Sequence, residues 1–172
     1  MKGGSLTFDN ASTFRTDGST LSIDGGNLEF RGDSKFLGNG SSISVSGGSI
    51  LTFDGSALRL GDGGSITFGD STRTTFGDST ITVNGGNFEY RGKASGSVGQ
   101  GSSLTIRGGD FILLDSSSFE VTGGSMNVND GSMNVRPGTG LVFGRGASVQ
   151  SNRVDVLAGG DVIWRAGART NF

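Results

Sequence analysis

The chain has 172 residues, with 14 Lys and Arg against 16 Asp and Glu and a formal net charge of −2. These charges are scattered singly, so no basic patch indicates a nucleic-acid partner. The absence of Cys and His excludes disulfides, thiolate and imidazole metal ligands, and Ser-His or Cys-His nucleophile pairs. We therefore expect no catalytic residue, metal or cofactor, and no membrane insertion, because no apolar run approaches the length of a membrane span.

Apolar and polar residues alternate in short segments that Gly-Gly, Asp-Gly and Asn-Gly separate. In chain order the apolar positions are Leu21/Ile23, Leu28/Phe30, Phe36, Ile43/Val45, Leu51/Phe53, Leu58/Leu60, Ile66/Phe68, Thr74/Phe76 and then Ile81/Val83. A period of two predicts strands with one buried face, and the glycine pairs predict tight turns. No segment carries an apolar stripe of helical spacing, so the sequence predicts an all-β protein.

A longer repeat is superimposed on the strands. Residues 19–48 match residues 79–109 at an offset of 60, and the best-matched block is GGN-L/F-E-F/Y-RG. We divide residues 1–146 into copies at about 3–62, 63–122 and a partial third at 123–146, followed by a degenerate repeat and end piece at 147–172. Each 60-residue superrepeat holds eight short strands, one every seven to eight residues.

These features predict a single-chain, right-handed parallel β-solenoid, because stacked coils tolerate sequence duplication and glycine suits their tight corners. The alternative is an intertwined trimeric β-helix in which each chain supplies one side of a shared core. Gly-Gly pairs recur mainly 22 residues apart, which suggests three-sided coils. A duplication that preserves stacking is expected to need a whole number of coils, and eight strands do not divide by three. We therefore favour two-sided coils of about 15 residues or four-sided coils of about 30. The smaller coils would make a rod of about eleven rungs and about 50 Å.

Two groups of residues suggest chemistry. The pairs Glu29/Arg31 and Glu89/Arg91 recur in the best-matched block, and we expect them to be ion pairs on the solvent face rather than a catalytic site. The aspartates that follow strands could bind calcium at the turns, but turn formation explains their positions more simply. They are Asp9, Asp24, Asp54, Asp62, Asp70, Asp78, Asp115 and Asp130.

Aromatic residues are expected mainly in the core. The phenylalanines that close strand segments predict stacked core positions rather than sugar platforms; they are Phe8, Phe30, Phe53, Phe68 and Phe76. Tyr90 replaces Phe30 in the repeat, so we expect its ring to be buried with the hydroxyl near an edge. The only tryptophan, Trp164, is interpreted as a plug for the C-terminal end of the core, with a ligand contact as the alternative.

The repeat is already in phase at Gly3, so the sequence predicts an N-terminal end without a cap. This pattern fits a cut fragment, a chain preceded by other parts, or a chain that stacks on another molecule. For the third case we predict self-association through Gly3, Gly4, Leu6 and Phe8, and head-to-tail stacking of this kind gives filaments.

The segment GGSLTFDNASTFRTDGSTLSIDGG and its copies resemble the Gly-Ser-Thr-rich β-solenoid repeats of bacterial autotransporter passengers and related surface proteins. The resemblance implies an extracellular or cell-surface structural role. Phage tail fibres and spikes have a similar composition, which implies a virion fibre as the alternative location.

We therefore expect a structural, fibre-forming or adhesive module whose main partner is another copy of itself. The first alternative is a phage tail-fibre or spike segment that binds a surface glycan. The second is a fragment of a polysaccharide-processing enzyme, which would need a carboxylate cleft on a lateral face.

Overall fold

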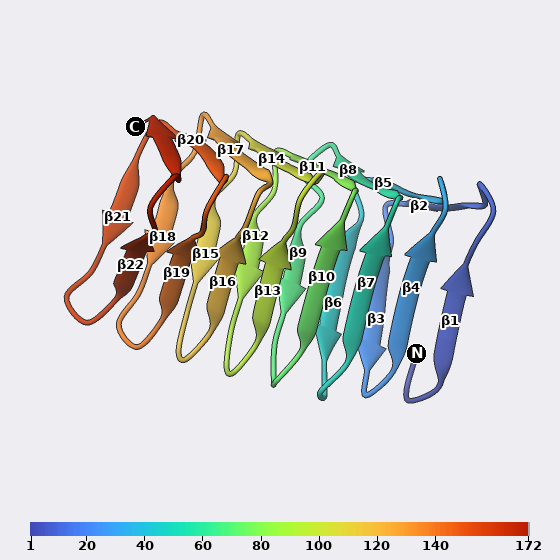
Figure 1. Ribbon diagram of the computed structural model, residues 1–172. Coiled ribbons are helices and arrows are strands. Elements are labelled where there is room, and N and C mark those ends of the chain that lie inside the picture. Colours follow the sequence, from blue (N-terminus) through green and yellow to red (C-terminus); the bar gives the residue numbers. More distant parts are fainter. Residues whose placement is uncertain (172) are drawn as a thin grey trace.

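A computed structural model describes residues 1–171, which form 23 short β-strands and no helix. Successive strands lie on three different sheets in turn, so each coil has three sides (Figure 1). In Figure 1 the chain rises on the front sheet, crosses the top and descends at the back as it advances from the N-terminus. This winding is right-handed, as expected, and the all-β single-chain parallel solenoid is confirmed.

The three sheets are parallel throughout. The first sheet holds β1 (Ser5–Phe8), β4 (Asn27–Arg31), β7 (Ile50–Asp54), β10 (Arg73–Gly77), β13 (Ser95–Val98), β16 (Ser118–Val121), β19 (Gly140–Phe143) and β22 (Asp161–Trp164). The second sheet holds β2 (Thr13–Asp17), β5 (Lys35–Asn39), β8 (Ala57–Gly61), β11 (Thr80–Asn84), β14 (Ser103–Arg107), β17 (Ser125–Asn129), β20 (Ser148–Ser151) and β23 (Arg169–Asn171). The third sheet holds β3 (Thr20–Asp24), β6 (Ser42–Ser46), β9 (Ile66–Phe68), β12 (Phe88–Tyr90), β15 (Phe111–Leu113), β18 (Met133–Val135) and β21 (Val154–Val156).

The coil size differs from the prediction. Ser5 lies beside Asn27, which lies beside Ile50, so these coils take 22 or 23 residues; Gly140 lies beside Asp161, so the last coil takes 21, and every coil has three sides. The preference for coils of 15 or 30 residues was therefore wrong, and the 22-residue spacing of the glycine pairs was the correct indication. Eight strands stack in the first sheet, and seven spacings of about 4.8 Å give a rod of about 34 Å rather than 50 Å.

The 60-residue superrepeat is out of phase with the coil. The block that contains Leu28 and Phe30 forms β4 in the first sheet, whereas its copy with Phe88 and Tyr90 forms β12 in the third sheet. Eight strands make two whole coils and two further sides, so each copy begins on a different side from the last. The assumption that duplication requires a whole number of coils fails because the three sides accept the same strand-and-corner unit.

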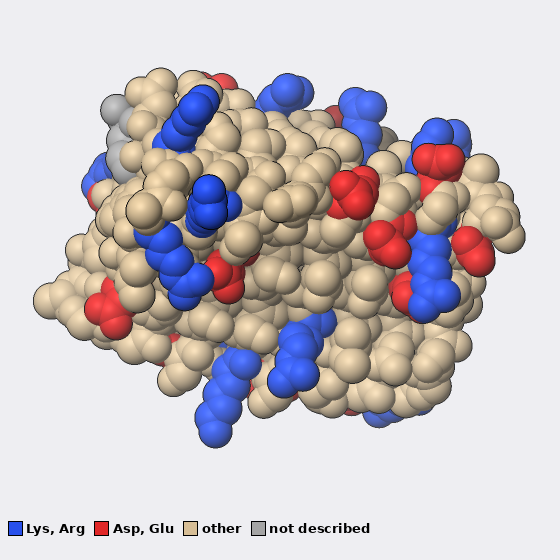
Figure 2. Space-filling model, viewed as in Figure 1, with Lys and Arg blue, Asp and Glu red and all other residues tan. Residues whose placement is uncertain are grey.

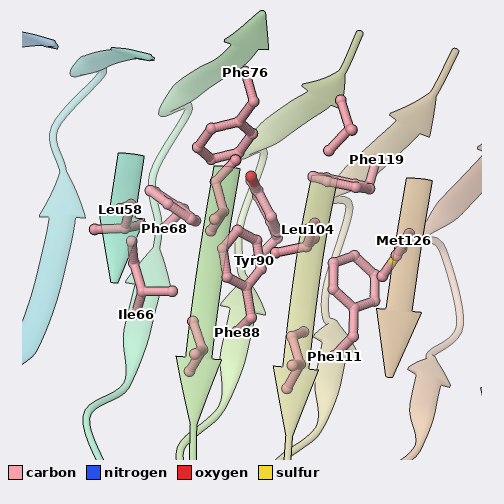
Figure 3. Close-up of a cluster of buried hydrophobic side chains, with 14 of the residues drawn as sticks. Leu58, Ile66, Phe68, Phe76, Phe88, Tyr90, Leu104, Phe111, Phe119 and Met126 are labelled. Carbon is pink, nitrogen blue, oxygen red and sulfur yellow. The ribbon is translucent and has the colours of Figure 1, made fainter. Parts of the chain in front are cut away.

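The core consists of columns of equivalent side chains from successive coils. Phe30 stacks on Phe8 at 4.7 Å and on Phe53 at 4.9 Å between ring centroids, and Phe76 continues this column. The rings of Phe68, Phe88 and Phe111 extend the aromatic core from the third sheet (Figure 3). Apart from Phe8 and Leu21, which are half-buried near the N-terminal end, the apolar side chains predicted to face inward are buried.

Tyr90 is buried as predicted, but its hydroxyl is not near an edge. The side chain is fully buried, and its Oη forms a hydrogen bond with Oγ1 of Thr74. Thr74 and Gly96 are consecutive members of an inward column whose neighbouring members are larger: Leu28 and Leu51 before them and Phe119 after them. A Cβ at Gly96 would overlap the Tyr90 hydroxyl, so the small residues on the first sheet make room for the larger ring on the third.

The corners explain many of the aspartates and glycines. Asp62, Asp70, Asp78, Asp115 and Asp130 adopt positive φ between 44° and 63°, a conformation that Asp tolerates better than most residues. The Asp115 carboxylate also accepts a hydrogen bond of 2.9 Å from the backbone N–H of Gly92 on the preceding coil. The positive φ values confirm the turn-forming role for five of the eight aspartates in the predicted group.

Candidate functional site

The N-terminal end of the solenoid presents core-facing side chains to solvent. Leu6 and Phe8 on β1 lie beside the buried Leu28 and Phe30, yet Leu6 remains 41% exposed. Gly3 and Gly4 form the preceding corner, where both have positive φ and Gly4 O accepts the N–H of Asn27. The four residues predicted for self-association therefore lie together at this end, although only Leu6 and Phe8 offer apolar side chains.

The sequence prediction for this end was incomplete. Phe14 on β2 and Leu21 on β3 are also half-buried core residues of the first coil. Within residues 1–171, β1 and β2 pair with a strand on one side only, and Lys2 forms an isolated parallel bridge with Asp24 of β3. The end thus combines exposed apolar side chains with free strand edges, which are pairing surfaces.

The C-terminal end has the same character. The predicted end piece, 147–172, contributes β20 to β23, which continue the three sheets; its residue 172 lies outside the described residues. Trp164 lies on β22 in register with Phe143, at 5.5 Å between ring centroids, and is 46% exposed. The predicted plug residue therefore lies over the last buried phenylalanine of its column, and Val162 is half-buried on the same strand.

The two Glu-Arg pairs form ion pairs across one face of a strand. Arg31 Nε lies 2.6 Å from Glu29 Oε1 on the first sheet, and Arg91 pairs with Glu89 on the third. Because the copies lie on different sides of the rod, the pairs do not assemble into one site. The Glu89 side chain is only 10% exposed, against 26% for Glu29, so the second pair is the more buried.

A hollow of about 580 Å³ lies on the second sheet near its N-terminal end, at the carboxyl ends of β2, β5, β8 and β11. Its charged and amide lining residues are Arg15, Asp17, Asn39, Arg59, Asp62 and Asn84. Leu37, Gly38, Gly61 and Thr16 complete the lining. Sequence reasoning missed this hollow because the residues become neighbours only when the coil length is known to be 22 or 23.

Other kinds of site have little support in residues 1–171. No group of three or more Asp or Glu side chains in this part of the chain is placed to hold a metal ion. The same residues include no helix long and apolar enough to cross a membrane. Phe30, Phe53, Phe68 and Phe76 are at most 1% exposed, so they are core residues, as predicted, and not platforms for sugars.

No protein-family model matches the chain, and no curated protein matches it either. The resemblance to autotransporter passenger repeats therefore remains a prediction from the sequence. Only the residues and their geometry support the functional proposals that follow.

Proposed function

We propose that the chain is a structural, fibre-forming or adhesive module that associates end to end with copies of itself at a cell or virion surface. The observation that carries this proposal is that both ends of the rod leave part of the core exposed. Each presents core-facing apolar side chains, Leu6 and Phe8 at one end and Val162 and Trp164 at the other. Each also presents parallel strand edges that a further coil would extend.

The register of the sheets predicts which residues meet. If the first sheet continues from β22 of one molecule into β1 of the next, Val162 lies beside Leu6 and Trp164 beside Phe8. Arg165 then lies beside Asp9, because each follows the last residue of its strand. This arrangement buries apolar side chains and brings Asp9 beside Arg165, which also pairs with Glu120 of its own chain.

The charge distribution supports the same contact. Residues 1–62 carry five basic and seven acidic side chains, a net −2, whereas residues 131–172 carry five basic and two acidic ones, a net +3. In Figure 2 the acidic side chains on the visible face lie mostly toward the N-terminal end. The opposite net charges of the two ends favour head-to-tail encounter. Contact between two N-terminal ends or two C-terminal ends is disfavoured, because each such pair carries charge of the same sign.

A disulfide test can detect this register, because the chain has no native cysteine. Thr7 and Ile163 are outward positions that would be neighbours across the junction at about 4.8 Å, within disulfide range. We expect the Thr7→Cys/Ile163→Cys variant to form a ladder of multimers on a non-reducing gel after oxidation.

The matched control is Thr7→Cys/Val142→Cys, since Val142 lies one coil inside the end. Equal ladders from both variants would refute the register. Sedimentation of the native chain as a 17.5 kDa monomer at all concentrations would refute the self-association itself.

A further inference from the structure

The lining of the hollow on the second sheet includes a position without a side chain, Gly61. Outward positions at the carboxyl ends of successive strands form a column of Asp17, Asn39 and Gly61, which Asn84 continues on β11. Gly61 therefore interrupts a run of carboxylate and amide side chains. Gly61 and its two neighbours in this column, Asn39 and Asn84, all line the hollow.

The fold does not require glycine at this position. Gly61 is absent from the described glycines with positive φ, so its backbone conformation suits other residues. A Cβ built at Gly61 would meet Asn39 Oδ1 at 3.4 Å and Gly38 O at 3.9 Å, which are ordinary contacts. By contrast, several corner glycines have no room for a Cβ. Neither the backbone conformation nor the packing of the core therefore requires glycine at position 61.

Two cationic side chains flank this space. Arg15, Leu37 and Arg59 occupy one outward column on β2, β5 and β8, so the arginines lie two rungs apart, at about 9 to 10 Å between backbones. Both are exposed, and neither forms an ion pair among residues 1–171. Of the eleven arginines, all within residues 1–171, four pair with a carboxylate and the other seven do not.

The lining indicates the chemistry of a ligand. Unpaired guanidinium groups bind carboxylates with paired N–H donors. Asn39 and Asn84 offer amide donors and acceptors, and Asp17 and Asp62 offer acceptors, which together suit a ligand rich in hydroxyl groups. The separation of the two arginines suits carboxylates on two units of one chain better than a single small anion.

We propose that this groove binds an acidic oligosaccharide. Arg15 and Arg59 bind carboxylates on two sugar units, and the Asn and Asp side chains bind hydroxyl groups above Gly61. This inference does not depend on end-to-end association, because the groove lies on a lateral face. It gives the protein a lateral recognition surface in addition to its structural role.

Isothermal titration calorimetry with tetragalacturonate and a hyaluronan tetrasaccharide tests the proposal. We expect binding of at least one of them, and at least tenfold weaker binding after Arg15→Gln or Arg59→Gln. Gly61→Asn should weaken binding at least tenfold, because it places a side chain between Asn39 and Asn84, where the ligand would lie. Arg73→Gln replaces an exposed arginine on the first sheet, away from the hollow, and should leave the affinity unchanged.

Three results would overturn the proposal. They are no binding of either acidic tetrasaccharide, equal binding of fully methyl-esterified tetragalacturonate, and displacement of the ligand by millimolar inorganic phosphate, which would indicate a simple anion site. Circular dichroism of every variant shows whether the solenoid has folded, so a loss of binding can be separated from a loss of structure.

Discussion

The buried hydrogen bond between Tyr90 and Thr74 gives a sharp prediction about stability. Tyr90 is fully buried and Thr74 is 2% exposed, so neither hydroxyl can exchange its partner for water. Tyr90→Phe removes one hydroxyl and leaves the Thr74 Oγ1 buried without a partner. Thr74→Val removes the other hydroxyl and leaves the Tyr90 Oη buried without a partner.

Each single substitution should cost about 1 to 3 kcal/mol of unfolding free energy, the usual cost of a buried polar group that loses its partner. Replacing both hydroxyls together leaves no orphaned polar atom, so the double variant should cost less than the sum of the single ones. We expect a coupling energy of about 2 kcal/mol. Thr75→Val, at the exposed neighbouring position of β10, should change stability by no more than about 0.5 kcal/mol.

Guanidinium chloride unfolding, followed by circular dichroism, measures all four variants. Additive effects of the two single substitutions would refute the coupling, and a costly Thr75→Val would show that threonine replacement alone explains the loss.

Three further predictions concern ionisation, ion pairs and corners. Burial raises the pKa of Tyr90 well above its ordinary value of about 10, so with rising pH the unfolded chain loses the phenol proton before the folded chain does. The unfolding free energy should therefore fall by about 1.4 kcal/mol per pH unit above pH 10. Tyr90→Phe should remove this pH dependence. Arg91→Ala should cost more stability than Arg31→Ala, which should cost at most about 1 kcal/mol, because Glu89 is more buried than Glu29; thermal melts of the two variants compare them directly. Gly109→Ala should destabilise the fold by about 2 to 4 kcal/mol in denaturant, because its Cβ would overlap the Gly86 carbonyl oxygen, whereas Gly140→Ala has no neighbour within 4 Å and should be nearly neutral.

The strands and their buried faces could be predicted because local alternation determines both. Pairs such as Leu51/Phe53 and Ile81/Val83 face inward as the period of two indicates. The number of sides could not be chosen correctly, because it depends on which strands pair. The 60-residue copies begin on different sides of the solenoid, so the length of the strongest sequence repeat is not a multiple of the coil length and did not indicate it.

The surface features show the same limit. Leu6, Phe8 and Trp164 were found because each departs from the repeat pattern or begins it. The groove was missed because Arg15 and Arg59 are 44 positions apart and have no shared motif. The role of Thr74 was missed as well, since only the third sheet brings Tyr90 toward it across the core.

The mismatch between superrepeat and coil has a consequence for how such a rod can change length. A strand with its corner is the smallest unit that every side accepts, so a rod of this kind can gain or lose single strands instead of whole coils. Each added unit turns everything after it by one third of a revolution. Duplication can therefore display one motif in several directions around the axis, as Glu29/Arg31 and Glu89/Arg91 already do on two different sides.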